Sequence, residues 1–446
     1  MTKIESVVKR SGAVVPFNQD RITNAIYRAA VSVGGRDRST AEGLSQQVVR
    51  ILEEATSADQ IPTVEDIQDI VEKVLIENGR AKVAKAYILY RDERSRRRRE
   101  RAVRASRPSE NIPWSKMWHV LDWAVSHNIH TIEAYNQRVA QGGLSDIIAV
   151  SEATYSEDVE NAVEVIAERL SEIKIVIVTG PSSSGKTTTT IKLGERLLRM
   201  GYSLVTLNVD NYFFDLELHP RDEFGDYDFE TPQALDLNLI NQHMKQLIDG
   251  QEVQIPFYDF KTGKRHDERT PMRLRSDELL LIDSLHALYP DMMDGISLDQ
   301  QFRLYLEPLL QMKTGDRNYV RWTDIRLMRR MLRDTAFRAY EPEKTLLHWH
   351  YVRTSELRNI IPYINSTDYI VNSAMPYELS IYRPKLLDMF SQWVTKYQDD
   401  PLREDAYRRA RRVYKVLKAV APLDDDGVVP DNSVLREFIG GSCYEY

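Results

Sequence analysis

The residues best suited to chemistry lie in the segment VTGPSSSGKTTTT, which runs from Val178 to Thr190. Within it, Gly180 to Thr187 matches the pattern GxxxxGK(S/T), between a strand-like apolar run and a helix-like segment. Glycines let backbone N–H groups approach phosphate oxygens, and the helix N-terminus adds a positive partial charge. We therefore expect Lys186 to reach the β- and γ-phosphates of ATP and the Thr187 hydroxyl to bind Mg²⁺. The residues expected to bind ATP are Gly180, Pro181, Ser182, Ser183, Ser184, Gly185, Lys186, Thr187 and Thr188.

Two carboxylates follow apolar segments downstream of this loop: Asp210 in LNVDNYF and Asp283 in LLLIDSLHAL. Together with the loop, these stretches resemble the uridine kinase–phosphoribulokinase family of P-loop enzymes. The resemblance implies that Asp210 is the general base that accepts the proton of an acceptor hydroxyl. It also implies that Asp283, where the family has Glu, holds Mg²⁺ together with Thr187 and Asp210. The alternatives are a strand-end carboxylate at Asp210 and a buried structural carboxylate at Asp283.

Two further segments resemble the acceptor site of this family. YDFETPQALD contains Phe229 and Glu230, where the family has a Phe-Asp pair that packs against and hydrogen-bonds the substrate sugar. A carboxylate suits a ribose diol because it can accept two hydroxyl donors. LNVDNYF and PFYDFKTGKR supply Tyr212 and Tyr258 as the aromatic candidates at the acceptor pocket.

Three departures from the family pattern leave the acceptor open. Glu230 is one methylene longer than the family's Asp, Thr231 replaces its His, and Gly263 stands where its base-reading His would fall. The expected acceptor is the 5′-hydroxyl of a nucleoside, and a non-nucleoside sugar or polyol is the alternative. The sequence names neither the base nor the choice between ribose and deoxyribose.

The segment RLMRRMLRDTAFRAY, residues 326–340, resembles the arginine-rich lid helix of the family. The resemblance places Arg330, Arg333 and Arg338 at phosphate-contacting, catalytic positions. Arg330 and Arg333 are three residues apart, so both can face one anionic site from one side of a helix. Guanidinium donors stabilise the charge that phosphoryl transfer spreads over the equatorial oxygens. The alternative is a solvated basic helix, in which Asp334 pairs with Arg338.

The first hundred residues resemble a different domain. VVKRSGAVVPFNQDRITNAI and AKAYILYRDERSRR resemble the opening and the closing helix of the ATP-cone, a regulatory nucleotide-binding domain best known on ribonucleotide reductases. The match implies that Lys9 and Arg10 contact phosphates, with Arg21 at a position usually held by Lys. A Lys-Arg pair at a strand end suits a phosphate. We expect this domain to bind regulatory ATP or dATP, and a generic helical domain is the alternative.

The elements that must position these residues indicate an α/β fold. Strand-like runs are expected at residues 173–180, 202–211 and 279–282, and strands that alternate with helices indicate a parallel sheet. The predicted fold class is a P-loop NTPase parallel sheet with a helical lid, preceded by a mainly helical ATP-cone domain and a helical connector. Thr63 and Asp66 predict a helix start of the capping-box type.

The expected domain bounds follow from these elements. They are an ATP-cone over 1–104, a helical connector over 105–172, a P-loop kinase domain over 173–382 with its lid at about 320–350, and a helical C-terminal extension over 383–446 packed on the kinase domain. The motif NSVLREFIGGS near the end resembles a uridine-kinase-like branch that carries N-terminal accessory domains. We interpret it as a packed tail.

The bulk composition excludes several classes. The 446 residues are 42% hydrophobic and 28% charged, as in ordinary globular proteins of two or three domains. No apolar run approaches the roughly 18 residues of a membrane span. The N-terminal stretch lacks the apolar core of a signal peptide, so we expect no export. Cys443 is the only cysteine, which excludes intrachain disulfides and predicts a cytoplasmic location. The net charge of −7 argues against general nucleic-acid binding, and RSRRRRER is interpreted as a solvated basic face.

Three functions from different classes remain open: a small-molecule kinase, a nucleotide-sensing regulator without transfer activity, and an ATP-driven switch or motor. The kinase explains Asp210, Glu230 and the lid arginines together. A lid helix within the chain favours it, because excluding water prevents wasteful hydrolysis. We therefore predict an ATP- and Mg²⁺-dependent kinase under allosteric control by ATP or dATP. We expect a homo-oligomer with a small-molecule acceptor, and neither a membrane nor a nucleic acid as partner.

Overall fold

The computed structural model describes residues 4–8, 14–35, 37–56, 61–89, 111–220, 231–315, 318–338 and 340–445. The predicted residues Lys9, Arg10, Phe229 and Glu230 lie outside the described residues, and so does the side chain of Arg338. Within the described ranges, no helix is both long enough and apolar enough to cross a membrane.

The chain divides into two compact units, Met1–Ser109 and Glu110–Tyr446. The first unit combines an antiparallel pair of strands with helices. Its elements are β1 (Ser6–Val8), β2 (Val14–Pro16), α1 (Asp20–Ser32), α2 (Arg38–Ala55) and α3 (Val64–Glu77), and residues 81–89 are also helical. Buried apolar residues such as Ile26, Val48 and Val74 come from one face of each long helix and share one core.

The start of α3 has the hydrogen bonds that the sequence predicts. The Thr63 hydroxyl oxygen accepts a hydrogen bond from the backbone N–H of Asp66 at 3.2 Å. The Asp66 carboxylate accepts one from the backbone N–H of Thr63 at 2.8 Å. This capping box confirms the predicted helix start, with Asp in the place usually held by Glu or Gln. Arg21, the regulatory-site candidate that is described, is exposed in the first turn of α1.

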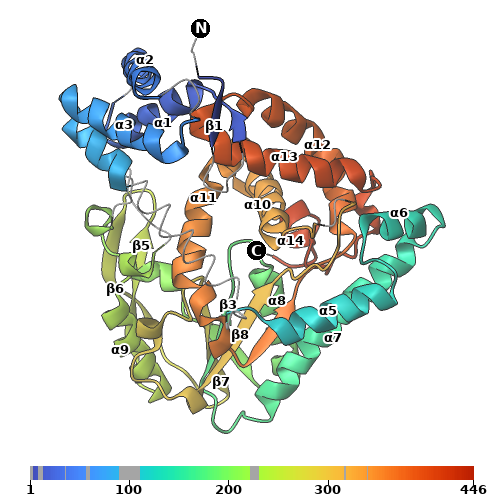
Figure 1. The fold of residues 1–446 in the computed structure, drawn as a ribbon. Coiled ribbons are helices and arrows are strands. Elements are labelled where there is room, and N and C mark those ends of the chain that lie inside the picture. The colour runs from blue at the N-terminus through green and yellow to red at the C-terminus, as the bar shows by residue number, and fades with distance from the viewer. Residues whose placement is uncertain are drawn as a thin grey trace. The chain divides into compact units, whose positions relative to one another are not determined.

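The second unit is built around a five-stranded sheet in the order β4-β7-β3-β8-β9. Figure 1 labels its three central strands, β7, β3 and β8. The strands are β3 (Ile175–Thr179), β4 (Ser203–Thr206), β7 (Glu278–Asp283), β8 (Gln301–Glu307) and β9 (Tyr369–Asn372). All neighbouring strands are parallel, which confirms the predicted α/β class. The sequence does not reveal β8 and β9, because β8 is interrupted by Arg303 and β9 has only four residues.

Helices and a hairpin cover both faces of this sheet. Successive residues of a strand point to opposite sides, so the apolar residues on each face need a covering layer of their own. In β3, Val176 and Val178 join a core with α7 and α8, whereas Ile175 and Ile177 join a second core with α9 and β5. The covering elements are α7 (Leu144–Ala167), α8 (Lys186–Arg199), α9 (Leu237–Ile248), β5 (Val253–Asp259) and β6 (Lys264–Met272).

The remaining helices also belong to the second unit. They are α5 (Trp114–Ser126), α6 (Ile132–Ala140), α10 (Trp322–Arg338), α11 (Pro342–Asn359), α12 (Glu378–Tyr397), α13 (Glu404–Ala419) and α14 (Arg436–Ile439). Residues of the expected connector, such as Tyr135 and Ile166, are buried in the same core as the sheet. α10 packs against both α11 and α14, so the end of the chain lies beside the predicted lid helix.

Candidate active site

The phosphate loop joins the end of β3 to the start of α8. Gly180 has φ +154°, and a Cβ there would lie 2.3 Å from the carbonyl oxygen of Leu306. Gly185 has φ +93°, and its Cβ would lie 2.6 Å from Cγ2 of Val434. Both positions therefore require glycine, which accounts for the two glycines of the motif. The Lys186 ammonium donates to the carbonyl oxygen of Gly180 at 3.1 Å.

The two predicted carboxylates lie at the same edge of the sheet as the loop. Asp283 ends β7 and is paired in register with Val178 of β3, two residues before the loop begins. Asp210 lies in the turn after β4, where its backbone N–H donates to the side-chain oxygen of Asn208 at 3.0 Å. β4 and β3 both flank β7, so the carboxyl ends of these three parallel strands lie at one edge of the sheet. This arrangement places Asp210 and Asp283 around Lys186.

The pKa values reflect this proximity. Burial raises the pKa of Asp283, and the nearby Lys186 ammonium partly opposes the rise. Desolvation by the surrounding protein, followed by the charge of Asp283, raises the pKa of Asp210, although its side chain keeps an exposed surface. Burial lowers the pKa of Lys186, and the charge of Asp283 acts in the opposite direction. A bound divalent cation would relieve the unfavourable ionisation of the two carboxylates.

The residues present fit one Mg²⁺ ion shared with a nucleotide. In the described part of the chain, no group of three or more His, Cys, Asp or Glu could hold a metal alone. Mg²⁺ sites of phosphoryl-transfer enzymes use one or two carboxylates, and phosphates and water complete the ligand set. Asp210 and Asp283 can supply the carboxylates, and Thr187 in the first turn of α8 can supply its hydroxyl.

The predicted lid arginines lie on α10, next to the phosphate loop. Arg330 donates to the Ser182 hydroxyl and to the Asp334 carboxylate, each at 3.3 Å. Arg333 donates to Asp334 at 3.2 Å. Their side chains keep 25% and 18% of their surface exposed, so both guanidinium groups lie at the border of the site. Asp334 thus pairs with these two residues, and its predicted pairing with Arg338 falls outside the described side chains.

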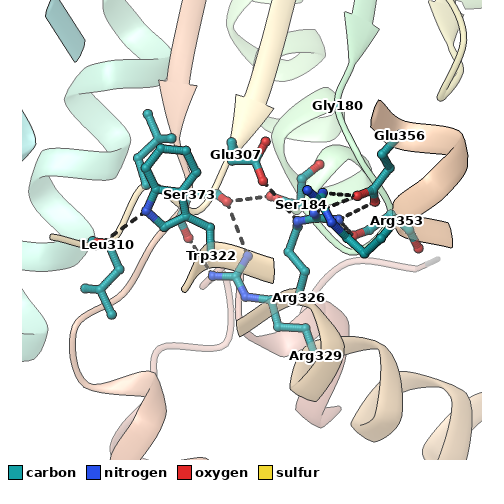
Figure 2. Close-up of polar contacts among 12 residues, drawn as sticks. Gly180, Ser184, Glu307, Leu310, Trp322, Arg326, Arg329, Arg353, Glu356 and Ser373 are labelled. Atoms are coloured by element: carbon teal, nitrogen blue, oxygen red, sulfur yellow. Dashed lines mark hydrogen bonds and ion pairs between the residues drawn. The ribbon is translucent and has the colours of Figure 1, made fainter. Parts of the chain in front are cut away.

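A third arginine of α10, Arg326, is fully buried and holds the loop from behind (Figure 2). Its guanidinium donates to the carbonyl oxygen of Ser182 at 3.1 Å. It also lies 3.0 Å from a Glu307 oxygen and makes two hydrogen bonds to Glu356, at 2.5 and 2.9 Å. Two carboxylates offset the cost of burying this charge, which is several kcal/mol for an unpaired ion.

Arg329 holds the other end of the loop through Ser373 (Figure 2). It donates to Glu378 at 2.7 Å and to the Ser373 carbonyl oxygen at 2.7 Å, and the Ser373 hydroxyl donates to the carbonyl oxygen of Ser184 at 2.5 Å. In a trans peptide the N–H points away from the carbonyl oxygen. Because the carbonyls of Ser182 and Ser184 face these partners, the N–H groups of Ser183 and Gly185 point away from them.

The two predicted acceptor tyrosines lie behind the Asp210 turn. Tyr212 has no exposed surface, and its hydroxyl is 2.9 Å from Nδ1 of His243. Tyr258 is 2% exposed and makes an edge-on contact with Phe260 at 4.9 Å between ring centres. Tyr212 is itself part of the turn that carries Asp210, and the backbone N–H of Tyr258 donates to the side-chain oxygen of Asn211 in that turn at 3.4 Å.

Gly263 has a structural reason to differ from the family pattern. Its φ is +67°, and a Cβ there would lie 2.8 Å from Cβ of Leu216. The backbone N–H of Leu216 also donates to the Gly263 carbonyl oxygen at 2.8 Å. A base-reading imidazole at this position would therefore collide with Leu216.

Two buried titratable residues near Lys186 were not identified from the sequence. His286, three residues after Asp283, is 5% exposed, and neither ring nitrogen has a hydrogen-bond partner within the described residues. Burial, with the Lys186 charge, lowers the pKa of His286 to about 4, so its imidazole is neutral at pH 7. Glu437 of α14 is 6% exposed and accepts hydrogen bonds from Thr188 of the loop helix. Both lie within segments quoted above, LLLIDSLHAL and NSVLREFIGGS, but neither residue is assigned a role from the sequence alone.

Comparison with known proteins identifies the two parts of the chain. Residues 5–96 match the ATP cone domain, and residues 175–379 match the Phosphoribulokinase / Uridine kinase family. The chain therefore carries an N-terminal ATP-cone domain and a phosphoribulokinase/uridine kinase family domain. The presence of the kinase-family domain supports ATP-dependent kinase activity. An enzyme with this activity is a phosphotransferase.

The individual relatives are of two kinds, a reductase and kinases. The chain is 45% identical over 105 residues to a vitamin B12-dependent ribonucleoside-diphosphate reductase of Thermoplasma acidophilum, which is 22% of this chain and 13% of the reductase. It is 27% identical over 198 residues to uridine-cytidine kinase B of Dictyostelium discoideum, which is 44% of this chain and 73% of that kinase. Over 44% of this chain and 86% of the relative, it is also 27% identical to a uridine kinase of Deinococcus deserti.

Proposed function

We propose that this protein transfers the γ-phosphoryl group of ATP to the 5′-hydroxyl of a nucleoside. The observation that carries the proposal is the cluster of Lys186, Asp210 and Asp283 around the phosphate loop of the kinase-family domain. A cation for the phosphates, a base for the acceptor and a carboxylate for a metal are the parts that such a transfer needs.

Asp210 acts as the general base in this proposal. It takes the proton of the acceptor hydroxyl while the hydroxyl oxygen forms a bond to the γ-phosphorus. The bond between the γ-phosphorus and the β–γ bridging oxygen breaks, and ADP leaves with that electron pair.

The charge of the transferring group is balanced by cationic residues on two helices. Lys186 of α8 and Arg330 and Arg333 of α10 direct positive charge toward the loop, where the equatorial phosphoryl oxygens would lie. The buried arginines of α10 keep the loop amides facing the ligand. Mg²⁺, when bound by Thr187 and Asp283 beside Asp210, would supply further neutralisation of the phosphate charge.

The nucleoside assignment rests on similarity to relatives, and the surroundings of Gly263 bear on recognition of the base. Two relatives are a uridine-cytidine kinase and a uridine kinase, which supports a nucleoside acceptor. Gly263 leaves no room for a base-reading imidazole, and this observation favours a sugar or polyol as the second candidate acceptor. Phe229 and Glu230 are the proposed sugar contacts in either case.

The deciding experiment is a phosphate-transfer screen with the full chain, ATP·Mg²⁺ and panels of nucleosides, nucleotides and sugars. The expected result is transfer to a nucleoside, with formation of the 5′-monophosphate. Asp210→Asn should keep ATP binding and lose about 10²–10⁴-fold in transfer rate, since an amide cannot accept the proton. Release of phosphate to water alone, or near-normal turnover by Asp210→Asn, would contradict the proposal.

We further propose that the ATP-cone domain regulates the kinase. Lys9, Arg10 and Arg21 would bind a regulatory ATP or dATP, and its occupancy would change the rate and the size of a homo-oligomer. The match of residues 5–96 to the ATP cone supports this assignment. Separately, we propose the cytoplasmic location that the single cysteine predicts.

A further inference from the structure

Residues 429–440, called the C-terminal segment below, are built into the phosphate loop. Val434 and Phe438 of this segment have no exposed surface. Val434 approaches Gly185 so closely that a Cβ on the glycine would lie 2.6 Å from its Cγ2. The Arg329 guanidinium lies 5.0 Å from the centre of the Phe438 ring. The segment therefore contacts both the loop and the helix that holds the loop.

Glu437 is the charged residue that this packing brings to the loop. Its Oε2 accepts hydrogen bonds from the backbone N–H of Thr188 at 3.1 Å and from the Thr188 hydroxyl at 3.0 Å. Thr188 is the third residue of α8, and the first N–H groups of a helix have no carbonyl partner within it. These are the donors that a phosphate loop presents to nucleotide phosphates. The carboxylate thus occupies donors that an anionic ligand would use.

The charges around Glu437 are those that a phosphate would meet. Lys186 and Arg333 both lie near enough to favour its ionised form. Burial nevertheless raises the pKa of Glu437, against the hydrogen bonds from Thr188 and these two cations. The carboxylate is therefore attracted by the phosphate site and at the same time desolvated in it.

We propose that Glu437 is an internal competitor of ATP, and that the C-terminal segment must withdraw it before the nucleotide can use the Thr188 donors. The inference rests on the proposed function, since it requires ATP to bind at the loop around Lys186. A carboxylate and a phosphate cannot share the same two donors, and their like charges repel at such a distance. The contact makes the resting enzyme self-inhibited, so that ATP binding and opening of the segment are coupled.

Arg436 links the two ends of the segment to each other and to the turn that precedes it. Arg436 donates to the carbonyl oxygens of Val429 at 2.6 Å, Asp426 at 3.0 Å and Gly440 at 3.2 Å. Gly440 has φ +84°, which suits the turn that brings its carbonyl back to Arg436. Withdrawal of Glu437 breaks the contacts with the loop and exposes the backbone bonds of the segment to solvent.

Glu437→Gln is the direct test, because the amide keeps the shape of the side chain and removes its charge. Affinity for ATP·Mg²⁺ at the Lys186 site should rise about 10-fold, as expected for loss of a charged hydrogen-bonded competitor. Calorimetry on the full chain can identify this site as the binding component that Lys186→Ala removes. Glu445→Gln is the matched control, since Glu445 is exposed in the same tail, and it should leave the affinity unchanged.

Hydrogen exchange of the wild-type protein gives a second measurement that needs no substitution of Glu437. The backbone N–H groups of Phe438 and Ile439 both donate to the Leu435 carbonyl oxygen inside the segment. ATP·Mg²⁺ should speed exchange across residues 429–440 in the wild type and have no effect there in Lys186→Ala. Unchanged or slower exchange in the wild type would overturn the proposal.

The outcomes also separate this inference from the proposed reaction. Equal or weaker ATP binding by a folded Glu437→Gln would make Glu437 a structural cap of α8 and overturn the inference, even if transfer occurs. Tighter binding by Glu437→Gln, with no transfer to any acceptor, would support the competitor and reject the kinase assignment.

Discussion

At the scale of single residues, burial within the site makes ionisation of Asp210 and Asp283 unfavourable. Burial raises the pKa of Asp283, so the folded protein holds this proton to a higher pH than the unfolded chain does. The stabilising contribution of the protonated group is complete below the unfolded pKa of roughly 4 and is lost as the pH rises through the folded pKa. At neutral pH the ionised Asp283 therefore opposes folding.

Asp283→Asn should consequently be more stable than the wild type at pH 7 to 8, by about 1 kcal/mol. The advantage should shrink as the pH falls toward 4, because the wild-type carboxyl then becomes neutral as well. Urea unfolding between pH 4 and 8, without nucleotide, measures this difference. Asp294→Asn, at an exposed position, is the control and should show little change at any pH. A pH-independent difference for Asp283→Asn would contradict the explanation.

The sequence predicts the site residues that belong to short contiguous motifs, and it misses those whose contacts lie far apart in the chain. The phosphate loop is one contiguous motif, and Asp210 and Asp283 follow directly on apolar strand-like segments. Glu437 bonds to a residue 249 positions earlier, and Ser373 to one 189 positions earlier. Such contacts arise from packing of the whole unit, so no spacing rule marks these residues.

At the scale of elements, α10 serves two purposes with one arginine-rich sequence. Arg326 and Arg329 point into the protein and hold the backbone of the loop, whereas Arg330 and Arg333 lie at its border. The sequence predicts an arginine-rich helix here, and the structure confirms the helix. It does not distinguish the two pairs, because the carboxylate partner of Arg329 is 49 residues away, on another helix.

Removing the cation of the buried pair tests the structural role of α10. Arg329→Met should destabilise the protein by about 3–5 kcal/mol, because Glu378 is then buried without its cation. Adding Glu378→Leu should recover most of that stability, since both charges are gone. ATP affinity should stay reduced in the double variant, because Ser373 is no longer held against the Ser184 carbonyl.

Denaturant unfolding and calorimetry on the single and double variants give the two quantities. Arg408→Met is the control: Arg408 pairs with Glu404 on the exposed face of α13, and such pairs contribute about 0–1 kcal/mol. Full recovery of ATP binding together with stability in the double variant would show that the loop keeps its shape without α10.

At the scale of the whole molecule, two nucleotide-binding domains on one chain raise the question of coupling. The ATP-cone domain and the kinase-family domain each predict a site, around Lys9 and Arg10 and around Lys186. A regulatory nucleotide can change activity only if it binds two states of the enzyme with different affinity, and typical couplings are about 5–150-fold. The same coupling must then act in reverse, from the kinase site to the cone.

The wild type should therefore bind two nucleotides per chain, and Lys186→Ala and the Lys9→Ala/Arg10→Ala double variant should each bind one. Removing the cone's phosphate contacts should leave binding at the Lys186 site and abolish the dATP-dependent change in transfer rate and oligomer size. Calorimetry, light scattering and initial rates on the three proteins measure these effects. If the wild type binds a single nucleotide per chain, and the cone substitutions do not alter it, the N-terminal domain has no regulatory site. Its helices would then be a structural or partner-binding module, and control of the kinase would have to come from the C-terminal segment and the ATP concentration alone.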